Sequence, residues 1–288
     1  GQLARYTQEY TGRELRIEGP LELDIGRQTT IEASGIYLGN APWAHNPNMV
    51  EVGDARLTID IPSLWGELLY LPEIHVSDCA LELLENDNGE DNWTFETGPD
   101  PETEEPEDDE AILPFAVGEL RIDRCGLVYD EPGRESPLTV RIESATLDRV
   151  ANGRVEGAVS GSVNGEPLEV DGWVAPASAF IEGGELQHEL HFRAGDVSLD
   201  STGSLADAAR FAGPNISGHF RGPDIAKVLR DYSLPPMSDG AFDFRLDLIT
   251  REGFTDIAVN GDLGTLEIRA DGSLDRLLEP RDGKLDAR

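Results

Sequence analysis

Histidines and acids are the residues of this 288-residue chain that could take part in catalysis or metal binding. Their spacing matches no known motif of either kind. The stretch "HELH" places His188 and His191 three residues apart. In a strand, side chains three apart point to opposite faces. A helical zinc site would also need histidines four apart and a placed glutamate. We therefore interpret these two as separate strand histidines. The sequence contains no Gly-x-Ser-x-Gly elbow, phosphate-binding loop or dinucleotide fingerprint.

The acidic stretch "ENDNGEDNW", residues 85–93, invites a calcium interpretation. Its acids do not follow the ladder of an EF-hand loop, and no glutamate lies at the bidentate position. We interpret the stretch mainly as a turn. Acidic pairs occur throughout the chain, so a glycosidase-type pair stays open, but nothing singles one out. The sequence therefore predicts no enzyme, no metal site and no cofactor.

The stretch "GIYLGNAPWAHNPNMVEVGDARL", residues 35–57, interrupts a series of alternating strands. It contains prolines, asparagines, Trp43 and His45, so it is either a reactive site or a corner. His45 has no acid–base partner nearby in sequence, and prolines and asparagines are typical of turns. We predict a corner, with Trp43 and Met49 covering an end of the apolar side of the sheet.

The formal net charge of −34 excludes nucleic acid and an anionic membrane surface as main partners. Only two of the 23 basic residues are lysines, Lys227 and Lys284. Solubility and adaptation to salt both explain such a charge, and the sequence leaves both open.

A period of two residues dominates the chain, as in "LRIEGPLELDI" (residues 15–25). Alternating apolar residues followed by Gly, Asn-Gly or Asp-Gly indicate half-buried strands joined by hairpin turns. At the first of these stretches we expect a strand pair with a turn near Gly19-Pro20. The sequence therefore predicts a mainly β protein.

Helix signals are few and short. They lie at residues 62–68, 204–213 and 223–232, the last with Asp224 as its N-cap. Residues 97–111 contain eight acidic residues and no basic one, which predicts a solvated, disordered loop. We therefore divide the chain into residues 1–96, the loop 97–111, and residues 112–288.

The two cysteines lie in an internal repeat. "IHVSDCALELLENDNG" (74–89) matches "LRIDRCGLVYDEPG" (120–133), which aligns Cys79 with Cys125. In both segments the apolar alternation shifts just before the cysteine, as at a β-bulge. If the strands are neighbours in register, a disulfide can form in an oxidising compartment. The alternative is two small apolar core residues.

Several motifs in a fixed order resemble the AsmA family, whose members are anchored in the membrane of the Gram-negative envelope. They are Thr11-Gly12-Arg13, then Asn40-Ala41 with Trp43, then Met49 with Gly53, and finally Gly89, Asn92-Trp93 and Phe95. Residues 218–248 and 261–275 resemble later segments of the family more loosely. The acidic stretch 97–111 departs from the family pattern.

The resemblance implies an elongated, twisted antiparallel sheet curled into a U-shaped groove, as in bridge-like lipid transfer proteins. It implies a periplasmic module that binds and transfers phospholipid and supports outer-membrane biogenesis and lipid homeostasis. Its partners would be phospholipid acyl chains, the inner membrane through an N-terminal helix that this sequence does not include, and outer-membrane or other envelope proteins.

The apolar positions of the alternating strands are then the candidate groove residues. Alternation alone fits a closed sandwich equally well, and the resemblance favours the groove. The candidates are Leu15, Ile17, Leu21, Leu23, Ile25, Ile31, Leu57, Ile59, Ile61, Leu81, Leu83, Val140, Ile142, Val159, Val170, Leu190, Phe192, Phe244, Leu246, Val259 and Ile268. Trp43, Met49 and Trp65 are the candidate caps at the groove ends.

Two other functions compete with lipid transfer. The first is a scaffold that binds other envelope proteins through open sheet edges, which are free to pair with a further strand. The second, with less support, is a carbohydrate-active β protein.

Overall fold

Strands form nearly all of the chain that the computed structural model describes. The described residues are 5, 7–8, 11–66, 68–95, 115–134, 136–150, 153–226, 239–251, 253–274 and 283–287. They divide into two units, residues 1–148 with 159–165, and residues 149–158 with 166–288. Each unit is described by itself below.

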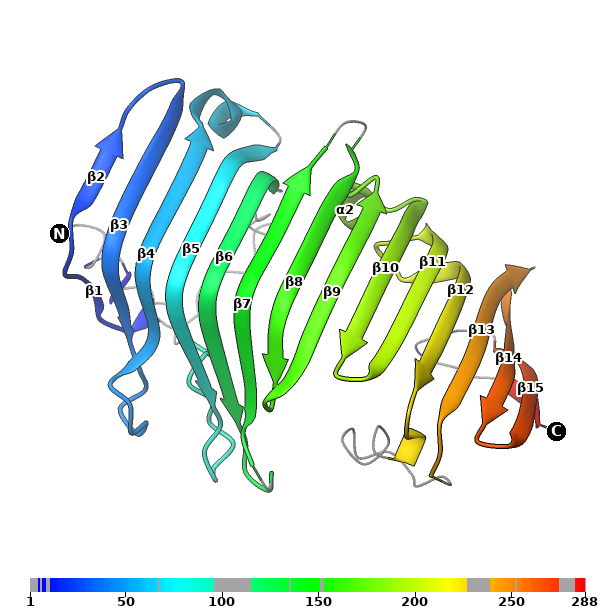
Figure 1. Cartoon of the computed structure of the whole chain (residues 1–288). Coiled ribbons are helices and arrows are strands. Elements are labelled where there is room, and N and C mark those ends of the chain that lie inside the picture. The colour runs from blue at the N-terminus through cyan, green and yellow to red at the C-terminus, as the bar shows by residue number, and fades with distance from the viewer. Residues whose placement is uncertain are drawn as a thin grey trace, which may run out of the picture. The chain divides into compact units, whose positions relative to one another are not determined.

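The first unit is a sheet with helical residues at positions 5, 7, 8 and 11 before its first strand and a short 3-10 helix at the end of its fourth strand (Figure 1). Its elements are β1 (Leu15–Ile17), β2 (Leu21–Asp24), β3 (Gln28–Gly39), β4 (Asn48–Asp60), η1 (Ile61–Trp65), β5 (Leu69–Leu84), β6 (Phe115–Asp130) and β7 (Leu138–Arg149). Strand β8 (Val155–Val163) is divided between the units.

The second unit is an antiparallel sheet with a short α-helix and helical residues at Ile225 and Ala226. Its elements are β9 (Glu166–Ala175), α2 (Ala179–Glu182), β10 (Leu186–Ala194), β11 (Val197–Asp207), β12 (Ala212–Gly222), β13 (Phe242–Arg251), β14 (Phe254–Leu263), β15 (Leu266–Leu274) and β16 (Gly283–Ala287). The helix α2 lies between β9 and β10, and Ile225 and Ala226 lie between β12 and β13. From β9 to β16, each strand pairs antiparallel with the next.

One strand pair in the first unit is parallel. β5 and β6 run side by side in the same direction, with Ile74 opposite Leu120 and Leu81 opposite Leu127. Two neighbouring parallel strands need a long connection, because the chain must return to the end of the sheet at which the first strand began. Here that connection spans residues 85–114, so the alignment of the internal repeat is confirmed as a register of paired strands.

The prediction of a mainly β protein built on an open, largely antiparallel sheet is confirmed. The strand pair expected at Gly19-Pro20 is wrong. β1 and β2 do not pair with each other, because both lie along β3, with Leu15 opposite Leu38 and Leu21 opposite Ala33. Gly19-Pro20 therefore interrupts one edge instead of reversing it.

The helix predicted over residues 204–213 is also wrong. Residues up to Asp207 belong to β11, and β12 starts at Ala212. Asp207 accepts a hydrogen bond from the backbone N–H of Arg210 (3.3 Å), which closes a tight turn between them. Pairing of Leu205 with both Leu186 and Pro214 overrides the helix propensity of the alanines.

Other predictions fall partly or wholly outside the described residues. The helix expected at 62–68 is present as η1. Of the helix at 223–232, only Ile225 and Ala226 are described as helical, and Asp224 Oδ1 accepts a bond from the Ala226 N–H (2.9 Å). The acidic stretch 97–111 lies outside the described residues. The domain boundary placed there separates β5 from β6, which pair within one unit.

Candidate functional site

Cross-strand pairing gathers the apolar residues of the first unit into rows on one face. Paired residues lie on the same side of a sheet, so each row follows from the register. Three of these rows are Ile31–Leu57–Ile74–Leu120–Leu147, Ile36–Val52–Cys79 with Cys125–Ile142, and Leu38–Val50–Leu81–Leu127–Val140.

The second unit has equivalent rows. One row is Val170–Phe192–Leu199–Phe220–Phe244–Gly261–Ile268, and the next is Gly172–Leu190–Ser201–Gly218–Leu246–Val259–Ala270. We call the surfaces that carry these rows the apolar faces of the two units.

Neither apolar face is buried. None of the 21 candidate groove residues is among the buried side chains, although all are apolar. Leu21, Leu23 and Ile25 are 61%, 56% and 77% exposed. Half of the buried apolar residues are alanines. A closed sandwich would instead bury its large apolar residues between two layers. Each unit therefore presents its apolar face open.

Two small apolar clusters cover the ends of the apolar face in the second unit. At one end, Ala179 of α2 and Ala208 pack on Leu186. At the other end, Ile225 packs with Phe242 and Leu263. Between these clusters, Leu190, Leu246 and Val259 remain half-exposed. The open part of this face is therefore bounded at both ends.

A row of irregular residues bends the strands of the first unit. Gly35, Gly53, Asp78, Arg124 and Glu143 each drop out of the strand pairing at the same level. The φ angles of Gly35, Asp78 and Arg124 are 61°, 54° and 53°, in the left-handed region. The strand register is the same on both sides of the row, so no strand gains the extra residue of a β-bulge. We call these five residues the bend row. The alternation of apolar residues shifts by one at this row, as the sequence predicts for the two cysteine segments.

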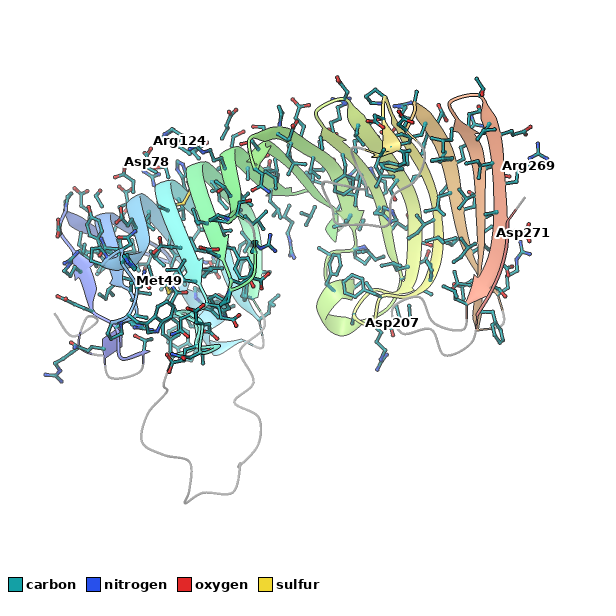
Figure 2. The ribbon with its side chains drawn as sticks, turned by 90° about the horizontal axis from the view of Figure 1, so that it is seen from below. Met49, Asp78, Arg124, Asp207, Arg269 and Asp271 are labelled. Atoms are coloured by element: carbon teal, nitrogen blue, oxygen red, sulfur yellow. A yellow bond between two sulfur atoms is a disulfide. The ribbon has the colours of Figure 1, made fainter. Side chains whose placement is uncertain are left out.

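Two cross-links join β5 and β6 at the bend row. Cys79 and Cys125 form a disulfide with their Cα atoms 4.4 Å apart. Beside it, Arg124 Nε and Nη2 donate to the two carboxylate oxygens of Asp78, both at 2.7 Å. Figure 2 shows Asp78 and Arg124 together on one side of the sheet. This bond lowers the pKa of Asp78 and raises that of Arg124.

The opposite faces of both sheets are polar and carry ion pairs. In the second unit, His191 Nδ1 lies 2.9 Å from Asp200, Arg221 donates to Asp200 (3.0 Å), and His219 lies 2.7 Å from Asp243. The hydrogen bond to Asp200 raises the pKa of His191 and lowers that of Asp200. Arg269 and Asp271 likewise project outward from β15 (Figure 2).

The histidines of "HELH" point to opposite faces, as predicted. His191 lies on the polar face, whereas His188 lies on the apolar face, 7% exposed and 2.9 Å from Ser201 Oγ. Burial lowers the pKa of His188. Within the described residues, no group of three or more histidines, cysteines or acids could hold a metal ion.

The predicted corner is confirmed but shorter than expected. β3 continues to Gly39 and β4 starts at Asn48, so the corner is residues 40–47. Met49 is buried (6% exposed) and Trp43 is half-buried. Trp65 on η1 is 81% exposed and packs little, which differs from the cap predicted there.

Sequence reasoning missed a hydrogen-bond network at this corner. Arg13 Nη1 donates to Asn40 O (2.9 Å), and Asn92 Nδ2 donates to Asn40 Oδ1 (2.8 Å) and Glu82 O (2.8 Å). Asn92 Oδ1 accepts from Leu84 N (2.9 Å), and Asn92 is fully buried. Three motifs far apart in sequence thus meet. In the sequence, the polar types of Arg13, Asn40 and Asn92 were the only sign that these motifs could bond to one another.

A hollow of about 570 Å³ lies on the first unit. Its lining includes one cross-strand row, Glu51–Ala80–Gly126–Arg141, in which the two small residues leave room between the charged ones. Met49 also lines it. The lining also includes Leu81, Leu127 and Val140, so the hollow borders the Leu81 row as well as these charged residues.

The fold and the site define an open-faced β protein in which each unit carries an apolar face of its own. The AsmA family model matches residues 1–164, more than half of the chain, so the chain belongs to the AsmA family. The match extends well past the first 95 residues, where the sequence motifs lie.

A curated relative is AsmA family protein YhjG of Escherichia coli (strain K12). It is 21% identical over 267 residues, which cover 85% of this chain and 38% of YhjG. The chain therefore spans less than half the length of that relative. No solved structure matches the chain significantly. Among the described residues, no helix has the length and apolar character needed to cross a bilayer.

Proposed function

We propose that the open apolar faces bind the acyl chains of phospholipids and that the protein transfers these lipids. The observation that carries the proposal is that large apolar side chains stay half-exposed along whole cross-strand rows. Soluble proteins rarely expose an apolar surface of this extent unless it binds something apolar. Membership of the AsmA family supports the same function.

The energetics favour acyl chains over ligands that need directed contacts. Each buried CH₂ group contributes about 0.8 kcal/mol, so two chains are held without a specific polar contact. Successive strands present side chains of similar size and chemistry to the open face, for example Leu190, Leu246 and Val259 within one row. One position of a chain therefore resembles the next, and movement along the face meets small barriers.

The disulfide bears on which cellular compartment contains the protein. A disulfide between Cys79 and Cys125 supports an oxidising environment, since the cytosol keeps thiols reduced. We therefore place this module in the periplasm, held at the inner membrane in the full-length protein. There it would support the lipid supply of the outer membrane.

Two adjacent residues of β14 give the sharpest test. Val259 is half-exposed on the apolar face, and Asn260 is exposed on the polar face. A carboxylate on an acyl-binding surface is costly because it loses hydration. We expect Val259→Asp to abolish phospholipid binding seen by native mass spectrometry after incubation with phospholipid vesicles. Asn260→Asp adds the same charge and should bind as the parent protein does.

Equal lipid occupancy in the two variants would contradict the proposal. The same vesicles, used in a donor–acceptor transfer assay, then measure movement as well as binding. Val259→Asp should lower the transfer rate at least tenfold, and Asn260→Asp should leave it within twofold of the parent. Circular dichroism of both variants checks that the sheet is intact.

A further inference from the structure

One polar pair interrupts the apolar face of the second unit. Ser201 on β11 belongs to the row of Leu190 and Leu246, and His188 on β10 lies one position further along. His188 Nε2 lies 2.9 Å from Ser201 Oγ. The side chains around the pair on this face are apolar or absent, since Val174, Leu190 and the glycines at 203 and 218 are its partners.

His188 differs from the other strand histidines that the structure describes. His75, His191 and His219 each lie within 2.9 Å of an aspartate on a polar face. His188 has no acidic partner among the described side chains and is buried, with 7% of its surface exposed. A neutral histidine on an apolar surface is costly unless it is hydrogen-bonded, and among the described residues its hydrogen-bond partner is Ser201.

The pair leaves one hydrogen-bonding group on the open surface. Ser201 is half-buried, so this residue is in part accessible from the open face, whereas His188 is buried. When the Nε2–H of His188 donates to Ser201 Oγ, the serine hydroxyl hydrogen is left for an acceptor that enters the face. Gly203 opposite His188 and Gly218 opposite Ser201 have no side chains to block that approach.

A serine beside a histidine also resembles a nucleophile and its base, but the other parts of such a site are missing here. A catalytic histidine is oriented by a third group, often a carboxylate, and backbone N–H groups stabilise the oxyanion. No described carboxylate contacts His188, and Ser201 lies mid-strand, where the backbone N–H groups serve the ladder. The arrangement is suited to binding.

We propose that Ser201, oriented by His188, is a hydrogen-bonding subsite for the ester carbonyl of an acyl lipid on the apolar face of the second unit. This inference rests on the proposed function, because it assumes that acyl chains occupy that face. The ester joins the acyl chain to the polar part of the lipid, so one hydrogen bond at the subsite favours one position of the chain along the face and still lets the chain move on. Ser201 is the contact residue, and His188 is a positioning residue.

An ester-to-ether comparison tests the subsite. The protein is incubated with an equimolar mixture of a diacyl phospholipid and its dialkyl ether analogue, with the same headgroup and chain lengths. An ether lacks the carbonyl acceptor. Because one hydrogen bond is at stake, native mass spectrometry should show the parent protein binding the ester about threefold to tenfold better. Ser201→Ala and His188→Phe should bind both lipids at a ratio near one.

Ser217→Ala is the matched control, because Ser217 is exposed on the polar face and donates to Asp247 (2.6 Å). It should keep the ester preference of the parent. A parent protein that binds both lipids equally would overturn the subsite and leave the proposed function standing. Absence of both lipids from the parent would overturn the proposed function instead. Release of free fatty acid by the parent but not by Ser201→Ala would overturn the assignment of binding alone.

Discussion

The two units bend their strands by different means. In the first unit, the bend row contains non-glycine residues with positive φ, Asp78 and Arg124, and a disulfide and an ion pair lie across it. In the second unit, glycines stand mid-strand without such cross-links, as does Gly161 on β8 in the first unit, where a Cβ atom would overlap the carbonyl oxygen of Arg141. At Gly172, Gly203 and Gly261, a Cβ atom would overlap a carbonyl oxygen of the neighbouring strand.

The difference shows two physical routes to a curved sheet with an apolar face. Left-handed conformations cost free energy for residues that have a Cβ atom, and the cross-links between β5 and β6 offset that cost. A glycine in the strand needs no cross-link, because the missing side chain lets the next strand approach. The ends differ as well, since the first unit uses a buried polar network and the second uses apolar clusters.

Removing the disulfide should have the largest effect and should act on the first unit. The disulfide closes a loop of 46 residues, for which chain entropy predicts a loss of about 4 kcal/mol in the free energy of unfolding. Urea denaturation with and without reductant measures this loss. The double variant Cys79→Ser/Cys125→Ser should match the reduced protein and should not respond to reductant. Equal stability with and without reductant would show that the bend row needs no covalent support.

Adding a methyl group at a mid-strand glycine should have the next largest effect. Gly203 has a φ of 147°, and its Cβ would overlap the carbonyl oxygen of Asn215. We expect Gly203→Ala to lower the free energy of unfolding by about 3 kcal/mol. Gly264→Ala, in a turn where a Cβ meets nothing within 4 Å, should cost about 1 kcal/mol. Similar costs in the two variants would argue against glycine as the means of bending.

Disrupting the polar network at the end of the first unit should have the third largest effect on stability. Asn92→Ala removes three of its bonds and leaves the Leu84 N–H and the Glu82 carbonyl without these partners. We expect a loss of about 2 kcal/mol in the free energy of unfolding, measured in urea. Asn88→Ala, at an exposed position of the same turn, should change stability by less than about 0.5 kcal/mol. An Asn92 variant as stable as the Asn88 variant would show that the network is dispensable.

The smallest expected effect is on the pH dependence of stability, where His188 on the apolar face and His191 on the polar face of the second unit act in opposite directions. Burial lowers the pKa of His188 below its usual 6.5, so the unfolded state takes up a proton first as the pH falls below 6.5. His188 therefore destabilises the fold on the acid side. The bond to Asp200 raises the pKa of His191, so its contribution is complete below pH 6.5 and is lost as the pH rises through the higher folded-state value.

Urea midpoints between pH 5 and pH 8 test these opposite signs. His188→Gln should reduce the loss of stability towards pH 5, and His191→Gln should increase it. The same slope for both variants would contradict the assignment of the two histidines to different faces.

Period-two alternation was sufficient to predict strands, because side chains in a strand face alternate sides whatever their partners are. The disulfide could be anticipated from the match between the segments around Cys79 and Cys125, since equal spacing along parallel neighbours keeps them level. The helix expected at 204–213 failed because strand pairing on both sides outweighs local propensity.

Less of the candidate site than of the fold could be predicted from the sequence. The apolar positions could be found, but their exposure depends on whether a second layer covers them, which alternation does not encode. The contact between Arg13, Asn40 and Asn92 joins residues up to 79 positions apart. The partner of His188 likewise follows from register, because Ser201 is one of several polar residues on β11 and only pairing brings it close.

Photo-crosslinking from neighbouring residues of β13 tests the central claim, that lipid lies on the apolar face, most directly. Leu246 belongs to the apolar face, and Asp247 is the next residue, on the polar face. A photoreactive amino acid at each position is irradiated in the presence of phospholipid vesicles, and covalent adducts are counted by mass. The account predicts phospholipid adducts from position 246 and few from position 247. Equal labelling from the two positions, or labelling from 247 alone, would contradict it.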